Sequence, residues 1–176
     1  MIPNVIFEPS LHPERLWALA GVKDHYGKNI KDKIVLDLGC GKHKTESHFI
    51  GVDMAPLAGI DCSAPLDCLP FSDGYADAII SRHSLEHMLN PAKTIKEWLR
   101  VLKTDGVIII ILPDHAVIDT MGEVMNKREP LDQHLHAYDR TSLMDFLKLF
   151  KEISILKAEV VIKGWSFGVV IKKIEI

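Results

Sequence analysis

"KIVLDLGCGKHKTESHFIGVDM" occupies residues 33–54 and places two short apolar runs on either side of a turn with two glycines. The first run, at 33–38, predicts a buried strand, and the second, at 48–54, predicts a strand that ends near an acidic residue. Glycines in the turn let the backbone bend tightly and approach a ligand without a Cβ in the way. The residues after the turn leave no room for a full helix, so we expect the first crossover helix to be shortened or missing.

The rest of the chain alternates helix and strand patterns and ends in two β-rich segments separated by a "KG" turn. In chain order, we expect a helix at 13–20, a short strand near Ile60, a strand at 75–82, a helix at 92–102, a strand at 106–112, a helix at 139–150 and a terminal hairpin. Asn90 is the expected N-cap of the helix at 92–102, and Asp139 or Thr141 is the expected cap of the helix at 139–150. This alternation predicts an α/β fold with a mostly parallel sheet and covered faces. We expect one domain over 1–176, with core motifs at 33–113, a connection at 114–138, and a final helix and antiparallel hairpin at 139–176.

The composition is that of one globular domain without a strong charge. A chain of 176 residues is long enough for a real core but short for two domains, and its formal net charge is −3. This charge provides no basic surface for nucleic acid or an anionic membrane, so we expect neither partner. Three cysteines without a CxxC spacing indicate reduced thiols and a cytoplasmic protein. The N-terminus lacks a signal-peptide pattern, and the longest apolar run, 107–112, is too short to span a bilayer and predicts a buried central strand.

Two acids near the glycine turn suit an adenosine-containing cofactor. Asp53 follows the second apolar run, where a carboxylate can accept hydrogen bonds from both hydroxyls of a ribose. Asp37 precedes the turn, where it is placed for an ammonium group. A dinucleotide is disfavoured, because its pyrophosphate needs a helix N-terminus directly after the glycines. S-adenosylmethionine carries no phosphate, and we expect it as the cofactor, against the alternative that the glycines only make a turn and Asp53 only caps its strand.

Several segments resemble, in the right order, the motifs of class I S-adenosylmethionine-dependent methyltransferases of the small methyltransferase domain 11 type. "VLDLGCG" at 35–41 is similar to the first motif and "GVDM" at 51–54 to the second. "LPFSDGYADAIISRHSLEHM" at 69–88 and "EWLRVLKTDGVIIIILP" at 97–113 resemble the family's segments around strands four and five. "QHLHAYDRTSLMDFL" at 133–147 resembles a His-x-His followed by a helix. The resemblance implies a Rossmann-like sheet with an antiparallel seventh strand.

The same resemblance implies a cofactor site at the carboxyl ends of the strands. Its cofactor-binding residues would be Asp37, Gly39, Cys40, Gly41, Asp53, Met54, Asp67, Cys68, Leu69, Ser81 and Arg82. Gly39 and Gly41 would line the methionine end, Asp53 would bind the ribose, and Met54 would pack on the adenine. The segment from Asp67 to Leu69 would edge the adenine ring. Ser81, Arg82 and His83, at the end of the fourth strand, would lie next to the sulfonium.

Departures from the family pattern affect this site. His43 stands where the family has a third glycine, which normally lets the first crossover helix pack closely. Without that helix the position is free to vary, and the basic cluster of Lys42, His43 and Lys44 either meets the cofactor's carboxylate or forms a solvated turn. The family has an acid a few residues before "LPF", and this position aligns with Pro65, two positions from Asp67. The resemblance therefore specifies the residues that contact the adenine less closely than the other cofactor residues.

Nine histidines raise the question of a metal site or a catalytic base. His83 and His87 are four residues apart and would share a helical face, a spacing that suits metal ligands. No cysteine set accompanies them and "HSLEH" already matches the family pattern, so we expect no metal and an internal pair of Glu86 with His87. Methyl transfer needs a base only where the acceptor must lose a proton, and His83, His134 and His136 are the candidates.

The sequence therefore favours S-adenosylmethionine-dependent methyl transfer to an acceptor that is small or delivered by a partner protein. The main alternative is a binding or regulatory protein of the same fold that keeps the cofactor site without catalysis. A nicotinamide enzyme or a nucleotide-sugar binder is a weaker alternative. The 114–138 connection is the only elaboration of the pattern, which argues against a large nucleic-acid acceptor.

Overall fold

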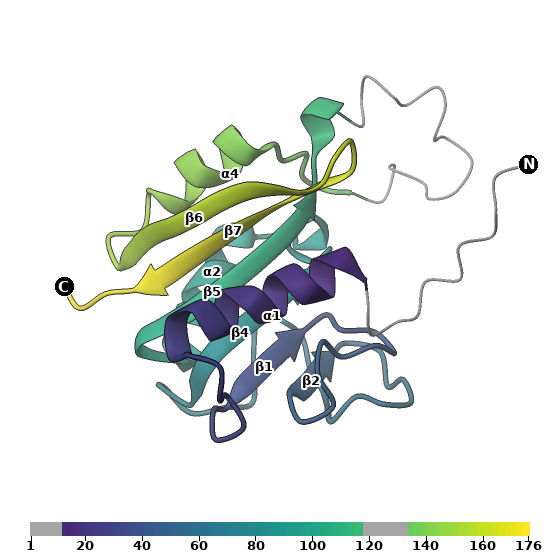
Figure 1. The fold of residues 1–176 in the computed structure, drawn as a ribbon, viewed down its shortest axis with the longest axis vertical. Coiled ribbons are helices and arrows are strands. Elements are labelled where there is room, and N and C mark those ends of the chain that lie inside the picture. The colour runs from purple at the N-terminus through teal and green to yellow at the C-terminus, as the bar shows by residue number, and fades with distance from the viewer. Residues whose placement is uncertain (1–11, 118–133) are drawn as a thin grey trace, which may run out of the picture.

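A seven-stranded sheet forms the centre of the computed structural model, which describes residues 12–117 and 134–176 (Figure 1). The strand order is β3-β2-β1-β4-β5-β7-β6. The elements are α1 (Pro13–Tyr26), β1 (Val35–Leu38), β2 (Ile50–Asp53), β3 (Cys62–Ser63), β4 (Ala76–Arg82), the 3-10 turn η2 (Leu85–His87), α2 (Pro91–Val101), β5 (Leu102–Pro113), α4 (Arg140–Leu147), β6 (Ile153–Ile162) and β7 (Ser166–Lys173). Neighbouring strands from β3 to β5 are parallel, whereas β7 is antiparallel to both β5 and β6. The expected α/β sheet with an antiparallel C-terminal hairpin is therefore confirmed.

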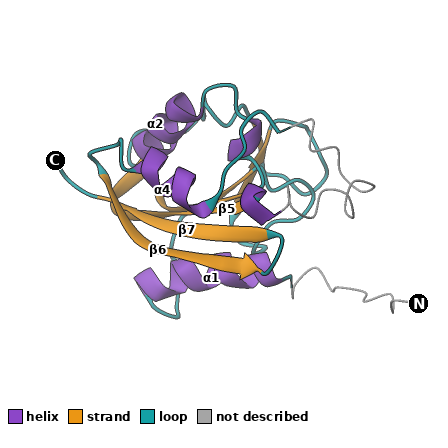
Figure 2. Cartoon of the chain, turned by 90° about the horizontal axis from the view of Figure 1, so that it is seen from above, coloured by secondary structure: helices purple, strands orange, loops and turns teal. Residues whose placement is uncertain are grey.

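Helices cover both faces of the sheet, with α1 on one face and α2 and α4 on the other (Figure 2). The central strand β5 is apolar because both of its faces are buried. Its side chains alternate between the two cores, with Ile108, Ile110 and Leu112 on the α2 face and Val107, Ile109 and Ile111 on the α1 face. This alternation confirms the expected central strand and explains its unbroken apolar run.

Helix α1 continues to Tyr26, beyond the expected end near residue 20. Gly21 has a low helix propensity, which is why the sequence pattern predicts an earlier end. In the structure this glycine lies against β5, where an added Cβ would stand 3.0 Å from Cγ1 of Ile109. Close packing of the helix on the sheet outweighs the local cost of the glycine.

Neither α1 nor any other helix in the described ranges is long and apolar enough to cross a membrane.

Residues 39–49 form turns and no helix, which confirms the expected loss of the first crossover helix. Asp37 holds this segment from the end of β1, because its carboxylate accepts the backbone N–H of Thr45. Lys44 donates to the carboxylate of Asp61 at 2.8 Å and ties the same segment to the approach of β3. Side-chain contacts therefore position this connection in place of a helix.

Local capping signals place the two later helices. The side chain of Asn90 accepts the backbone N–H of Lys93 at 3.0 Å, and Pro91 opens α2, as expected. Asp139, one of the two expected caps of α4, forms a capping box with Ser142. The terminal hairpin also turns at the expected "KG" pair.

The expected 114–138 connection is described only in part, because residues 118–133 lie outside the described residues. Its last residues lie beside η2. The backbone N–H groups of Leu135 and His136 both donate to the carbonyl oxygen of Glu86, at 2.9 and 3.0 Å. This segment therefore returns to the carboxyl end of β4, where the functional residues gather.

Candidate functional site

The strand order reverses between β1 and β4, because the chain runs outward through β2 and β3 before it returns to the other side of β1. Open α/β sheets bind ligands at the carboxyl ends of the strands at such a point. Here the two ends come so close that an added Cβ on Gly39 would stand 2.0 Å from Oγ of Ser84. Gly39 also has a φ of +67°, a left-handed conformation that favours glycine. The first glycine of the turn is therefore required by the backbone arrangement.

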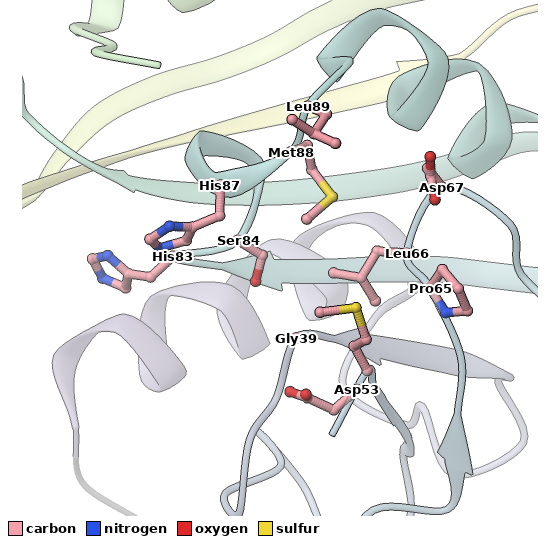
Figure 3. Close-up of a pocket in the computed structure, with 11 residues that line it drawn as sticks. Gly39, Asp53, Pro65, Leu66, Asp67, His83, Ser84, His87, Met88 and Leu89 are labelled. Atoms are coloured by element: carbon pink, nitrogen blue, oxygen red, sulfur yellow. The ribbon is translucent and has the colours of Figure 1, made fainter. Parts of the chain in front are cut away.

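Two cavities meet at these strand ends. The first, called here the Met88 cavity, has a volume of about 370 Å³ and is lined by Gly39, Asp53, Met54, Pro65, Leu66, Asp67, His83, Ser84, His87, Met88 and Leu89 (Figure 3). The second, the Arg82 cavity, has a volume of about 570 Å³ and is lined by His12, Glu14, Arg15, Gly39, Cys40, His43, Arg82 and His83. Gly39 and His83 line both, so the two cavities adjoin at these residues.

Helix α2 holds the wall of the Met88 cavity that residues 65–67 form. Nε1 of the fully buried Trp98 donates to the carbonyl oxygen of Leu66 at 2.9 Å. At the outer edge, Lys93 pairs with the carboxylate of Asp67 at 2.8 Å. These two contacts fix an otherwise irregular loop against the helix.

Asp53 and Met54 form the opposite side of the Met88 cavity at the end of β2. Oδ2 of Asp53 accepts the N–H of Gly41 at 2.9 Å, and its Oδ1 accepts the N–H of Ala55 at 3.1 Å. Met54 is 72% exposed at the cavity mouth. A carboxylate beside an exposed apolar side chain suits a ligand that carries hydroxyl donors next to a flat ring.

Two guanidinium groups give the Arg82 cavity a positive end. Arg15 comes from the first turn of α1, and Arg82 from the end of β4. Nη2 of Arg82 donates to the carbonyl oxygen of His43 at 2.9 Å and lies 3.9 Å from Oδ2 of Asp37. Its buried Nε has no hydrogen-bond partner among the described residues. Burial, followed by the charge of Arg82, lowers the pKa of Arg15, so an anion between the two arginines would be stabilised.

The surroundings of Cys40 and Asp37 raise the pKa of each side chain and indicate a structural role for both. Burial and the nearby carboxylates of Asp37 and Asp53 raise the pKa of Cys40 to about 11, so its thiol stays protonated at neutral pH. Asp37 is fully buried behind the cavity wall. Burial raises the pKa of Asp37 in spite of the opposing effects of Arg82 and Thr45. The structure thus places this carboxylate beneath Arg82, where it orients the guanidinium and the turn.

His83 lies between the two cavities and is held as a cation. Its Nε2 is 2.9 Å from Oε1 of Glu14, and its Nδ1 is 3.7 Å from Oε1 of Glu86. Burial lowers the pKa of His83, but the hydrogen bond to Glu14 and the contact with Glu86 outweigh it and raise the pKa to about 9. A protonated imidazole has no lone pair for a proton, so this geometry argues against His83 as a general base at neutral pH.

The other two predicted bases, His134 and His136, line neither of these cavities. Nε2 of His136 is 2.9 Å from the carbonyl oxygen of Met88. Nδ1 of His134 is 3.1 Å from Nε2 of His115, and its ring lies edge-on to that of His87, with 4.9 Å between centroids. The two histidines therefore lie behind the wall that His87 and Met88 form.

The predicted cofactor residues divide into two groups. Those that line a cavity are Gly39, Cys40, Asp53, Met54, Asp67 and Arg82, and those that do not are Asp37, Gly41, Cys68, Leu69 and Ser81. Leu69 and Ser81 are buried in the core, and Pro65 and Leu66 form the wall where the sequence places Cys68 and Leu69. The cofactor contacts of all these residues stay predictions.

Sequence reasoning missed Glu14 and Arg15, which α1 brings into the Arg82 cavity. The helix itself is predicted from "PERLWALA", but an acid and a base in a first helical turn are also typical of a solvated helix end. Only the packing of α1 across β4 and β5 shows that these two side chains are buried. The signal lies in tertiary structure, outside any local pattern.

Comparison with known proteins agrees with this arrangement. Residues 14–150 match the family model of the methyltransferase domain. The chain is 30% identical over 141 residues to the chloroplastic tocopherol O-methyltransferase of Arabidopsis thaliana, covering 66% of this chain and 39% of that protein. It is 24% identical over 123 residues to ajmaline N-methyltransferase of Rauvolfia serpentina, covering 56% of this chain and 42% of that protein. The chain therefore belongs to the methyltransferase domain family, as the motif resemblance predicts.

Among solved structures, the chain is similar to 1,6-didemethyltoxoflavin-N1-methyltransferase of Burkholderia thailandensis, crystallised with 1,6-didemethyltoxoflavin and S-adenosylhomocysteine. The TM-score is 0.69 at 15% identity, covering 92% of this chain and 79% of that chain. At this identity the likeness shows a shared fold. The chain spans about two fifths of the length of the two plant relatives, whose names indicate methylation at oxygen and at nitrogen.

Proposed function

We propose that this chain binds S-adenosylmethionine across the Met88 and Arg82 cavities and transfers its methyl group to an acceptor that is small or delivered by a partner protein. The observation that carries the proposal is the meeting of the two cavities at Gly39 and His83, with a carboxylate in one and two guanidinium groups in the other. Membership of the methyltransferase domain family supports it. S-adenosylmethionine supplies an activated methyl group on a sulfonium, between a nucleoside and an amino-acid carboxylate.

The residues of the two cavities match the two ends of that cofactor. Asp53 would accept hydrogen bonds from the ribose hydroxyls, and Met54 and Leu66 offer apolar surface to a purine. Arg15 and Arg82 would bind the carboxylate, for which planar guanidinium groups are well suited. Gly39 lies where the two cavities meet, and an added Cβ there would clash with Ser84.

The groups at the junction position the reactants. In-line displacement depends mainly on holding acceptor and methyl group in line. His83 joins α1 to η2 through Glu14 and Glu86, and so fixes the end of β4 next to both cavities. Because His83 is a cation at neutral pH, we assign it a role in orienting the reactants. An acceptor that does not have to lose a proton needs no base here.

A cofactor-binding protein without methyl transfer is the second candidate. The state of His83 favours it, because the one predicted base that lines the cavities is held as a cation. We place either protein in the cytoplasm, and the three free cysteines agree with a reducing compartment.

Cofactor binding and methyl transfer are tested separately. Calorimetry should show binding of S-adenosylhomocysteine and no binding of NAD. Methyl-labelled S-adenosylmethionine, incubated with the chain and a cell extract, should then label either the small-molecule or the protein fraction. Binding of S-adenosylhomocysteine without labelling of either fraction would replace the first candidate by the second. Binding of NAD alone would contradict both.

A further inference from the structure

We propose that Glu86, His87 and His134 form a binding site for a divalent transition-metal ion beside the Met88 cavity. One ligand atom from each of the three residues lies within 4.8 Å of the other two. One carboxylate and two imidazoles are the protein ligands of many zinc sites that keep an open position. The sequence predicts no metal, because no cysteine set accompanies His83 and His87 and "HSLEH" already matches the family pattern.

The backbone imposes this meeting. Glu86 and His87 lie in η2, directly after the end of β4. The carbonyl oxygen of Glu86 accepts the N–H groups of both Leu135 and His136. These two bonds hold the neighbouring His134 beside η2, so the cluster rests on fixed backbone contacts.

The carboxylate of Glu86 is a second and independent observation. Its side chain is 1% exposed, and neither oxygen has a hydrogen-bond partner among the residues that the structure describes. Two imidazole nitrogens approach only loosely, with Nδ1 of His83 at 3.7 Å and Nε2 of His87 at 3.9 Å from Oε1. A buried carboxylate in such surroundings is costly unless a cation or hydrogen bonds compensate it. A metal ion bound at Oε1 or Oε2 would supply that compensation.

His115 is placed as an outer partner of the site. Its Nε2 lies 3.1 Å from Nδ1 of His134, and both rings are shielded from solvent in part. Metal-bound imidazoles usually donate their second ring N–H to an acceptor, and here a ring nitrogen of His115 lies within hydrogen-bond distance. We therefore assign coordination to Nε2 of His134 and orientation of its ring to His115.

The donor types favour Zn²⁺ over Mg²⁺ and Ca²⁺. Imidazole suits zinc, copper and nickel, whereas magnesium and calcium prefer oxygen ligands. Zinc bonds of 2.0–2.2 Å bring tetrahedral ligand atoms to about 3.3 Å apart, so the three side chains must close from their present spread. The side chain of His87 is 39% exposed and is the most exposed of the three. Three protein ligands leave one position for water or for an oxygen atom of a molecule in the Met88 cavity.

The test is a Zn²⁺ titration of the full chain without a histidine tag, in competition with a chromophoric chelator. We expect one Zn²⁺ per chain and no displacement by excess Mg²⁺. His87→Ala should lower the affinity at least a hundredfold, and His115→Ala by roughly 10–100-fold, the loss typical of an outer partner. His48→Ala, at an exposed histidine beside Phe49, is the matched control and should bind as wild type does.

Two further measurements keep the result decisive. Thermal melting shows that each variant is folded. A further variant, Glu86→Gln, removes the charge of the carboxylate while keeping its shape. The visible spectrum of bound Co²⁺ reports directly on the ligand set and should change in His87→Ala and in Glu86→Gln. The proposal is overturned if wild type binds no Zn²⁺ against the chelator, or if His87→Ala and Glu86→Gln both bind as tightly as wild type. Neither outcome bears on binding of S-adenosylhomocysteine, which is measured separately.

Discussion

The two cavities at the strand ends are built in opposite ways. The Met88 cavity draws all of its lining from residues 39–89, in which the glycine turn, the end of β2 and η2 follow one another. The Arg82 cavity also needs the first turn of α1, which reaches it only because the helix packs across the sheet. The first offers a carboxylate and apolar walls, and the second offers guanidinium groups. A ligand that is complementary to both cavities therefore has apolar surface and hydroxyl donors at one end. Its other end carries an anionic group.

The largest effect is expected at Gly39, which both cavities share. Gly39→Ala would put a Cβ 2.0 Å from Oγ and 2.9 Å from Cβ of Ser84, at a φ of +67°. A left-handed alanine costs roughly 1–2 kcal/mol and overpacking roughly 1–3 kcal/mol. We expect the free energy of unfolding to fall by about 2–5 kcal/mol, measured by urea unfolding.

Gly41→Ala is the matched control for this variant. Gly41 also has a left-handed φ, of +55°, but an added Cβ would meet nothing within 4 Å. Its replacement should cost only the backbone contribution, about 1–2 kcal/mol. Equal losses for the two variants would show that the turn alone, and not the close approach of β1 to β4, requires Gly39.

Asp53→Ala addresses the Met88 cavity alone. Loss of two charge-assisted hydrogen bonds to a ribose should weaken binding of S-adenosylhomocysteine by about 2–4 kcal/mol, measured by calorimetry. Asp73→Ala is the control, because Asp73 lines neither cavity and its carboxylate is paired with Arg100 at 2.7 Å. It should change affinity by less than about 1 kcal/mol. A dissociation constant that Asp53→Ala leaves unchanged would place the ribose elsewhere.

Local patterns were sufficient for most of the fold, and four predicted cofactor residues, Gly39, Asp53, Met54 and Asp67, line the Met88 cavity. Gly39, the Asn90 cap and the "KG" hairpin each depend on neighbouring residues, and Asp53 is the last residue of β2, which the sequence predicts as a strand. The wall at 65–67 is different, because its register is set by the bond from Trp98 to the carbonyl oxygen of Leu66. Of the segment from Asp67 to Leu69 that the sequence expects at the adenine ring, only Asp67 lines the cavity, together with Pro65 and Leu66.

Long-range packing determines what the sequence does not predict. Arg15 enters the site because α1 crosses β4 and β5, and His134 meets Glu86 through backbone bonds between distant segments. A motif of fixed spacing contains neither relation. The protonated state of His83 also depends on Glu14 from α1, so its role could not be predicted from the fourth-strand motif alone.

Arg15→Gln separates the Arg82 cavity from its neighbour. If Arg15 binds the carboxylate of the cofactor, its loss should weaken binding of S-adenosylhomocysteine by about 1.5–3 kcal/mol. Adenosine carries no carboxylate, so its affinity should stay as in wild type. Calorimetry with both ligands measures the difference. Equal losses for the two ligands would mean that the variant disturbs the whole site.

The smallest effect is expected at Lys44, in the connection that lacks a helix. The basic cluster at 42–44 either meets the cofactor's carboxylate or serves the turn, and the structure pairs Lys44 with Asp61 at 2.8 Å. Asp61 also accepts the N–H of Gly51 at 2.7 Å. The bond from Lys44, followed by the one from Gly51, lowers the pKa of Asp61. We therefore assign Lys44 to the fold of the turn.

Lys44→Met tests this assignment through stability and binding together. The free energy of unfolding at pH 7 should fall by about 0.2–1 kcal/mol, as for other exposed pairs, while affinity for S-adenosylhomocysteine stays unchanged. Because the pKa of Asp61 is lowered in the folded state, its contribution is present above the ordinary aspartate pKa and is lost as the pH falls through the lowered value. The difference between wild type and variant should accordingly shrink in acid. A variant with unchanged stability and much weaker binding would instead place Lys44 at the carboxylate and give the Arg82 cavity a further cation.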